Sequence, residues 1–224
     1  MPKPSDYLQG YEWVPAAHNY RRPNGTFVKR DRVLELLETS LNNRERTMLK
    51  GTTAFVEGKI SARAWVSRQS TMLQREYLQN AALAAGGWDR LTDADLARIQ
   101  ARLNTEFGRI ASMADQITAG QVTEAQALAR IRMYQGGARR EYYDVERETL
   151  PATGEGMVRL ERRMLGPTED HCKTCPDLAD QGWQPEGTLP VPGEGSECDG
   201  NCRCEMITRT VSARAADVLI GTKD

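Results

Sequence analysis

The sequence predicts a mainly α protein, an antiparallel helical bundle followed by a small cysteine-rich β-ribbon domain. Apolar residues recur at helical spacing through four long segments between residues 31 and 150. All five cysteines of the 224-residue chain fall within the 34 residues from His171 to Cys204, and a strand-like segment lies on either side of them. We therefore expect four parts: an extended N-terminal arm (1–30), the helical bundle (31–150), a cysteine-rich knob (151–211) and a tail (212–224).

The composition fits a globular chain with a helical body. Hydrophobic residues make up 39% of the sequence and charged residues 27%. The 30 basic and 31 acidic side chains give a net charge of −1, so no overall field favours nucleic acid, and any contact with DNA would have to be local. The longest apolar runs span only a few residues, so we expect no membrane-spanning segment.

The first 30 residues do not show helical periodicity. The pair Asn24-Gly25 is a strong hairpin signal, weakened by Pro23 just before it. Two interpretations are open: the arm folds back over its own bundle, or it docks on a neighbouring subunit. The aromatic residues spread through this arm are Tyr7, Tyr11, Trp13, Tyr20 and Phe27.

The first two helices are bounded by residues that start and stop helices. We expect the first to run from Asp31, as N-cap, to Gly58, and the second from Ser61 to Gly86. Their apolar residues recur in steps of three, four and seven. Members of these stripes include Leu34, Leu41, Met48 and Phe55 in the first helix, and Trp65, Leu73 and Tyr77 in the second.

The third and fourth helices follow in the same manner. The third opens at Thr92 and ends at Gly120, and the fourth opens with a capping-box pattern over residues 123–126. In the middle of the fourth, Gly136-Gly137 indicates a kink or a close crossing with another helix. The core stripes show no polar cluster that would demand a buried active site. The third stripe is the most regular: Leu96, Ile99, Leu103, Phe107, Ile110, Met113 and Ile117.

Two strand-like segments flank the cysteines. Residues 157–165 alternate imperfectly, and residues 204–211 are expected to pair with them as a two-stranded ribbon. The residues from Ser212 to Asp224 are expected to be a polar or weakly helical tail. The small core around the cysteines is expected to contain Trp183, Leu189 and Val191.

The cysteines form two short-spaced groups. A C-x2-C pair is followed, after a Gly- and Pro-rich connection of 22 residues, by a C-x3-C-x-C cluster. Two local chelates joined by a loop can supply four tetrahedral ligands to one structural Zn²⁺. The ion would staple a β-ribbon that is too small to be stable alone, so the predicted fold is a helical bundle with a zinc-stapled β-ribbon domain. The candidate metal ligands are Cys172, Cys175, Cys198, Cys202 and Cys204.

The identity of the four ligands is open. Cys172 and Cys175 belong to every set considered, and Cys202 and Cys204 point to the same side of an extended chain. Cys198 and His171 are the remaining candidates.

Other uses of the cysteines are less favoured. Disulfides would leave one thiol over, and the polar first residues lack the apolar segment of a secretory signal. A redox C-x-x-C needs a thioredoxin-like context that the helical sequence upstream does not offer. A catalytic zinc usually has His ligands and a nearby Glu base, and the sequence contains only His18 and His171.

The C-terminal third resembles the minor head proteins of tailed bacteriophages, in particular the Mu F-like head-morphogenesis family. The familiar form ends in a His-Pro-x-Cys-Arg-Cys type motif, whereas here Cys198 stands in the neighbourhood of the missing histidine. The resemblance covers residues 157–211, and the helical part matches only in general character. It rests on a helical body, a strand, the run 170–175, then Gly182, Trp183, Pro185, Leu189, Pro190, Pro192, Gly193 and the run Asn201-Cys-Arg-Cys204.

The resemblance implies a structural virion protein rather than an enzyme. Such a protein is assembled in the bacterial cytoplasm and lies at or near the portal vertex, in multiple copies of a symmetric assembly. Its expected partners are portal, major capsid or connector proteins, through which it supports head assembly or joins head to tail. The sequence agrees in showing no catalytic constellation and no nucleotide-binding loop.

Two rival functions follow from the same residues. In the first, the knob is a zinc ribbon that binds nucleic acid. The acidic residues of this region make it unlike a DNA-binding surface; they include Glu161, Asp170, Asp177, Asp180, Glu186, Glu194, Glu197, Asp199 and Glu205. Its phosphate contacts would be Arg162, Arg163, Lys173, Arg203 and Arg209. The second rival is an enzyme with a Cys nucleophile beside His171, for which no orienting third group is visible.

Overall fold

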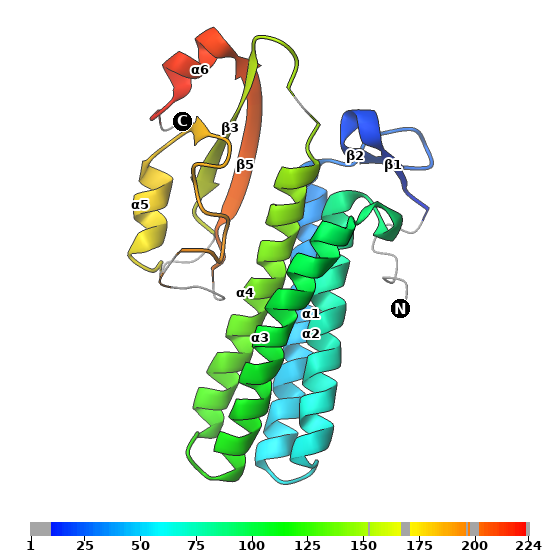
Figure 1. Ribbon diagram of the computed structural model, residues 1–224, viewed down its shortest axis with the longest axis vertical. Helices are drawn as coiled ribbons and strands as arrows, with labels where there is room; N and C mark the ends of the chain where they lie inside the picture. The colour runs from blue at the N-terminus through cyan, green and yellow to red at the C-terminus, as the bar shows by residue number, and fades with distance from the viewer. Residues whose placement is uncertain (1–9, 152, 167–170, 196, 198–201, 223–224) are drawn as a thin grey trace. The chain divides into compact units, whose positions relative to one another are not determined.

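The computed structural model describes residues 10–151, 153–166, 171–195, 197 and 202–222 (Figure 1). The chain divides into two compact units, which we call the helical unit (Met1–Thr149) and the C-terminal unit (Leu150–Asp224). The described residues are mainly helical with small antiparallel sheets, as predicted. None of the described helices combines the length and the apolar character needed to cross a bilayer.

Four long helices run side by side in the helical unit (Figure 1). Ser61 and Thr92 are N-caps as predicted, and Thr123 and Gln126 form the reciprocal hydrogen bonds of a capping box. Asp31 lies in the first turn of its helix rather than at the N-cap, which is Lys29. The helices are α1 (Arg30–Val56), α2 (Ala62–Ala85), α3 (Asp93–Thr118) and α4 (Glu124–Thr149).

Helices α2 and α4 cross closely at the glycine pair of α4. A β-carbon at Gly137 would lie 2.1 Å from the hydroxyl oxygen of Tyr77 on α2. Nearby, the Asn80 side chain donates a hydrogen bond of 2.9 Å to the Ala138 carbonyl. Of the two interpretations of the glycine pair, the structure therefore shows the close crossing. The predicted stripes supply much of the core, including Leu37, Leu41, Met48, Trp65, Leu73, Ile99, Leu103, Ile110, Met113 and Ile131.

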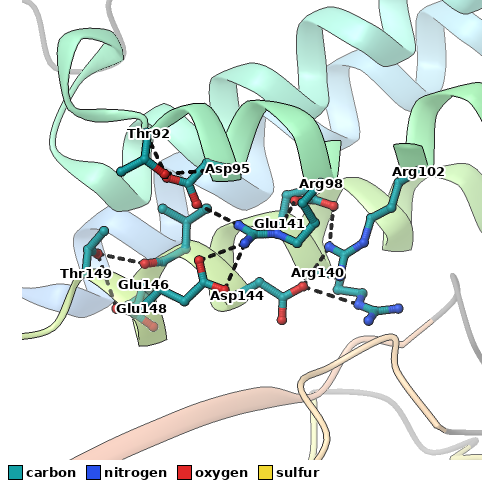
Figure 2. Close-up of polar contacts among 11 residues, drawn as sticks. Thr92, Asp95, Arg98, Arg102, Arg140, Glu141, Asp144, Glu146, Glu148 and Thr149 are labelled. Carbon is teal, nitrogen blue, oxygen red and sulfur yellow. Dashed lines mark hydrogen bonds and ion pairs between the residues drawn. The ribbon is translucent and has the colours of Figure 1, made fainter. Parts of the chain in front are cut away.

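The bundle also holds a cluster of charged side chains beside the core stripes, which the sequence did not reveal. Glu141 of α4 is fully buried and pairs with Arg102 of α3, which also reaches Asp144 at 2.6 Å. Arg98 joins Asp95 at 2.8 Å and Glu148 at 2.7 Å, so a ladder of charges links α3 to α4 (Figure 2). These side chains flank the apolar stripe of α3. The long side chains of Arg98 and Arg102 extend from α3 and bring their charged ends to acidic residues of α4. Helical periodicity does not reveal such pairs.

Asp95 combines two roles at the start of α3. It accepts hydrogen bonds from the Thr92 backbone and hydroxyl, which completes a capping box, and it pairs with Arg98 (Figure 2). Burial alone would raise the pKa of Asp95, but the hydrogen bonds from Thr92 and Arg98 outweigh it and lower the pKa. The charged form therefore stabilises the fold above the ordinary pKa, and this contribution is lost as the pH falls through the lowered value.

Replacement of Asp95 by Asn should lower the free energy of unfolding by about 1 kcal/mol at neutral pH. The difference from the unmodified protein should begin to narrow below a pH of about 4, the ordinary pKa of an aspartate, and should vanish as the pH falls through the lowered pKa of Asp95. Urea unfolding followed at a series of pH values would measure it. Asp115→Asn, at an exposed position in the last turns of the same helix, is the matched control. A difference for Asp95→Asn that stays constant into acid would contradict the expectation.

The described part of the N-terminal arm is not extended but folds back on its own bundle. The Tyr20 hydroxyl donates to the Leu83 carbonyl at 2.8 Å, and the Trp13 ring packs so closely on Gly86 that a β-carbon there would lie 2.1 Å away. The predicted turn forms at Asn24, whose side-chain oxygen accepts hydrogen bonds from Thr26. Tyr7 lies outside the described residues. The arm forms β1 (Glu12–Val14), a 3-10 helix (Pro15–Ala17) and β2 (Asn19–Arg21), and a second 3-10 helix (Trp88–Arg90) follows α2.

The C-terminal unit contains the predicted ribbon and more. Strands β3 (Met157–Met164) and β5 (Glu205–Ser212) pair antiparallel, from Met157 opposite Ser212 to Met164 opposite Glu205. A third short strand, β4 (Gln184–Pro185), pairs with the other edge of β3. Two short helices, α5 (Thr174–Asp180) and α6 (Ala213–Leu219), complete the unit.

The expected tail is part of the fold. Ser212 caps α6 through a hydrogen bond from Ala215, and Ile220 forms a parallel bridge with Trp183. Helix α6 packs on an apolar cluster on one face of the sheet, so these residues belong to the folded unit and do not form a separate tail. The buried members of this cluster are Leu160, Trp183, Val211 and Ala216.

Candidate metal centre

Three cysteine sulfur atoms meet in the C-terminal unit. Cys175, Cys202 and Cys204 are buried, and their sulfur atoms all lie within 4.8 Å of one another. Cys172 is half-buried and packs against these three. The sulfur atoms of Cys175 and Cys202 are 3.8 Å apart, whereas a disulfide would need about 2.05 Å. Four thiolates at about 2.3 Å from a tetrahedral ion lie about 3.8 Å apart, so these cysteines could hold a metal ion.

Local structure brings the two groups together. Cys172 and Cys175 are joined by a turn in which the Cys175 N–H donates to the Cys172 carbonyl, at the start of α5. Cys202 and Cys204 lie in the segment just before β5, and both point into the cluster, as the alternation of an extended chain predicts. Each group could therefore act as a local chelate for a metal ion, and the pairing of β3 with β5 fixes the position of the second group.

Hydrogen-bond donors converge on the sulfur atoms. The backbone N–H groups of Gly193 and Cys204 donate to Cys202, and that of Gly166 donates to Cys204. Position 166 must be glycine, since a β-carbon there would lie 2.2 Å from the Arg203 carbonyl oxygen. Donors aimed at sulfur favour the thiolate, which is the form that binds metal.

The two neighbouring thiols titrate as a pair. The hydrogen bond from the Cys204 thiol, aided by backbone N–H groups and the charge of Arg163, lowers the pKa of Cys202 to about 4 against the opposing effect of burial. The same hydrogen bond and burial raise the pKa of Cys204.

A row of charged side chains on β3 holds the loop beside the cluster. Arg159 pairs with Glu186 at 2.9 Å, and the buried Glu161 accepts a hydrogen bond of 2.7 Å from the Leu189 N–H. Arg163 donates to the Pro190 carbonyl at 2.6 Å and to the Cys202 sulfur at 3.8 Å. These residues alternate with Leu160 along the strand, so they lie on the face opposite the apolar cluster.

This row of charged residues was not predicted from the sequence. Its available signal was the alternation Arg-x-Glu-x-Arg within a predicted strand. Charges placed at every second position mark one face of a strand, and here that face is covered by the loop.

The predicted site residues have different outcomes. Cys172, Cys175, Cys202 and Cys204 come together, while Cys198 lies outside the described residues. His171 is half-buried, and among the described residues its ring nitrogens do not join the group of clustered ligand atoms. The expected core residues Trp183, Leu189 and Val191 are all buried, but Trp183 packs in the apolar cluster rather than around the sulfur atoms.

One residue of the rival nucleic-acid interpretation is reassigned. Arg163 is fully buried, with its donors on Pro190 and Cys202, so it cannot serve as a phosphate contact.

The fold and the site together define a helical-bundle protein with a thiol-lined candidate metal centre in a separate small unit. No family model, no curated protein and no solved structure matches the chain.

Proposed function

We propose that the candidate metal centre binds a structural Zn²⁺ ion and that the ligands of this ion are Cys172, Cys175, Cys202 and Cys204. Four thiolates make a complete tetrahedral set, which is typical of structural rather than catalytic zinc. The spacing of the Cys175 and Cys202 sulfur atoms and the burial of three of the four thiols support this assignment. Bound zinc would tie the segment before α5 to the segment before β5.

The small size of the C-terminal unit supports a structural metal. Its apolar cluster has only four buried residues, and units of this length rarely gain enough stability from their core alone. The ion would join the far end of the sheet, where β3 and β5 begin to diverge, to α5. The apolar cluster with α6 would hold the opposite end.

For the whole chain we propose a structural role in a tailed-phage particle, as a minor head or portal-vertex component. The observation behind this proposal is the set of motifs in the C-terminal third. The structural roles of three of these motif residues, Gly182, Trp183 and Pro190, support it. Gly182 has a positive φ of 65°, and a β-carbon there would lie 2.2 Å from the Thr222 carbonyl oxygen. Trp183 fills the apolar cluster, and Pro190 receives the Arg163 hydrogen bond. The motif builds an architecture, which suits a protein that acts by contact.

In this role the protein would work through surfaces rather than through chemistry. As ligands of a bound zinc ion, the four cysteines would be occupied and so would not be available for nucleophilic catalysis. The helical unit would contact portal, capsid or connector proteins, and the zinc-bound unit would present a second rigid surface. Several copies would act together in a symmetric assembly.

The proposal is tested on purified phage particles and on the isolated protein. Mass spectrometry should find the chain in the particles, and co-purification with the portal, capsid and connector proteins of the same genome should show which one it contacts. Absence from the particles would overturn the virion role. Binding to DNA with a steep dependence on salt would instead favour the nucleic-acid alternative.

The ligand assignment predicts different zinc contents for single Cys→Ser variants. The unmodified protein should contain about one zinc ion per chain. Changes at Cys172, Cys175, Cys202 or Cys204 should reduce it strongly, whereas Cys198→Ser and His171→Ala should retain it. Elemental analysis of the purified variants measures this. Loss of zinc in Cys198→Ser with retention in Cys172→Ser would show that the ligand set is wrong.

A further inference from the structure

Arg163 occupies a position where a charged side chain is costly. It is fully buried on β3, the central strand of the three-stranded sheet. Moving a cation out of water costs several kcal/mol unless an opposite charge compensates. The Pro190 carbonyl satisfies one donor but brings no charge. The Cys202 sulfur lies 3.8 Å from the guanidinium Nη1 and would carry negative charge as a thiolate ligand of the proposed zinc ion.

The proposed metal centre has the complementary excess of charge. Four thiolates around a divalent ion leave a net charge of about −2 in a largely buried site. Hydrogen bonds from the backbone of Gly193 and Cys204 reduce its cost but add no positive charge. A guanidinium at hydrogen-bond distance from one of the sulfur atoms donates a hydrogen bond and also adds a positive charge.

We propose that Arg163 is a positioning residue of the metal centre. Its charge balances the thiolates, and its two donors fix the Cys202 sulfur relative to the loop at Pro190, which leads on to Gly193. This inference rests on the proposed zinc site and goes beyond the ligand set. Arginine suits the task better than lysine, because its planar guanidinium presents two donors in fixed directions to two acceptors.

The test compares variants at Arg163 with matched variants on the same face of β3. Arg163→Met removes the charge and both donors at similar length, and Arg163→Lys keeps the charge but cannot hold both acceptors. Arg159→Met is the control, since Arg159 contacts Glu186 and the Pro151 carbonyl but no sulfur. Glu161→Gln tests whether the carboxylate two residues away, rather than the thiolates, is the main counter-charge.

Two measurements are made on each full-length variant. Competition with a chromophoric chelator gives the zinc affinity, and substitution with Co²⁺ gives the sulfur-to-metal charge-transfer band. Arg163→Met should weaken zinc binding about 10- to 100-fold. It should also move the band to lower energy, because a thiolate that loses a hydrogen bond donates more readily. Arg163→Lys should lose less affinity but still shift the band, and Arg159→Met and Glu161→Gln should leave the band in place.

The outcomes separate this inference from the zinc proposal. If the unmodified protein binds zinc and Arg163→Met binds it as tightly with an unchanged band, the role of Arg163 is refuted and the zinc site stands. Equal losses of zinc affinity in Arg163→Met and Arg159→Met would show that Arg163 only stabilises the fold, which also refutes the inference. If Arg163→Met does not fold, an unshifted band in Arg163→Lys refutes the inference. If the unmodified protein binds no metal, both proposals fall together.

Discussion

Removal of zinc with a chelator should unfold the C-terminal unit and leave the helical unit folded. Structural zinc contributes apparent free energies on the order of 10 kcal/mol to small domains, which exceeds what the small apolar cluster of the C-terminal unit can replace. The helical unit has its own core and no candidate ligand cluster among its described residues. Hydrogen exchange read by mass spectrometry should therefore show loss of protection in β3 and β5 and little change in α1 to α4.

Two controls make this result specific. Adding Zn²⁺ back should restore protection, and Cys175→Ser should reproduce the chelated state without a chelator. Cys175 is chosen for the substitution because its sulfur atom lies 3.8 Å from the sulfur atom of Cys202. Full protection of β3 and β5 in metal-free protein would show that the unit is stable through its apolar cluster alone, and the zinc proposal would lose its physical basis.

Replacement of Gly137 by Ala should destabilise the helical unit by about 3 kcal/mol, which lowers its melting temperature by about 10 °C. The new β-carbon would lie 2.1 Å from the Tyr77 hydroxyl oxygen, and the Tyr77 ring is buried and cannot move aside without disturbing the crossing of α2 and α4. Thermal unfolding followed by circular dichroism measures the change.

The chain provides an internal control of opposite sign. Gly108 lies within α3 with nothing within 4 Å of an added β-carbon, so Gly108→Ala should stabilise by about 1 kcal/mol through helix propensity. Tyr77→Phe removes the clashing oxygen, after which the nearest ring carbon lies 3.2 Å away. The double variant should recover most of the loss. If Gly137→Ala stabilises as Gly108→Ala does, the close crossing is not present.

The helical unit follows closely from the sequence because its signals are local. A cap such as Thr92 satisfies backbone donors within its own turn, and a stripe such as that of α3 needs only a period of 3.6 residues. The charged ladder between α3 and α4 was missed for the opposite reason. Whether Arg102 meets Glu141 depends on how two helices lie beside each other, which no single period encodes.

The C-terminal unit shows where sequence patterns stop being informative. The paired strands were predicted, but β4 has two residues and α5 and α6 have seven each, too few for a period to be recognised. Within the site, the spacing of the cysteines predicted the two chelates. The spacing could not show which four of the six candidate residues would bind the metal ion. It also gave no sign that Arg163 donates a hydrogen bond to a sulfur atom.

The hydrogen bond between His18 and Thr149 has a practical consequence. The His18 ring lies 3.0 Å from the Thr149 hydroxyl oxygen, so the described arm near the start of the helical unit contacts the last residue of that unit. A domain whose two ends lie together can be inserted into a loop of another protein, or circularly permuted, without stretching the chain. We therefore expect that the helical unit can be inserted into a host scaffold through a short linker at its N-terminal end and studied there as a module.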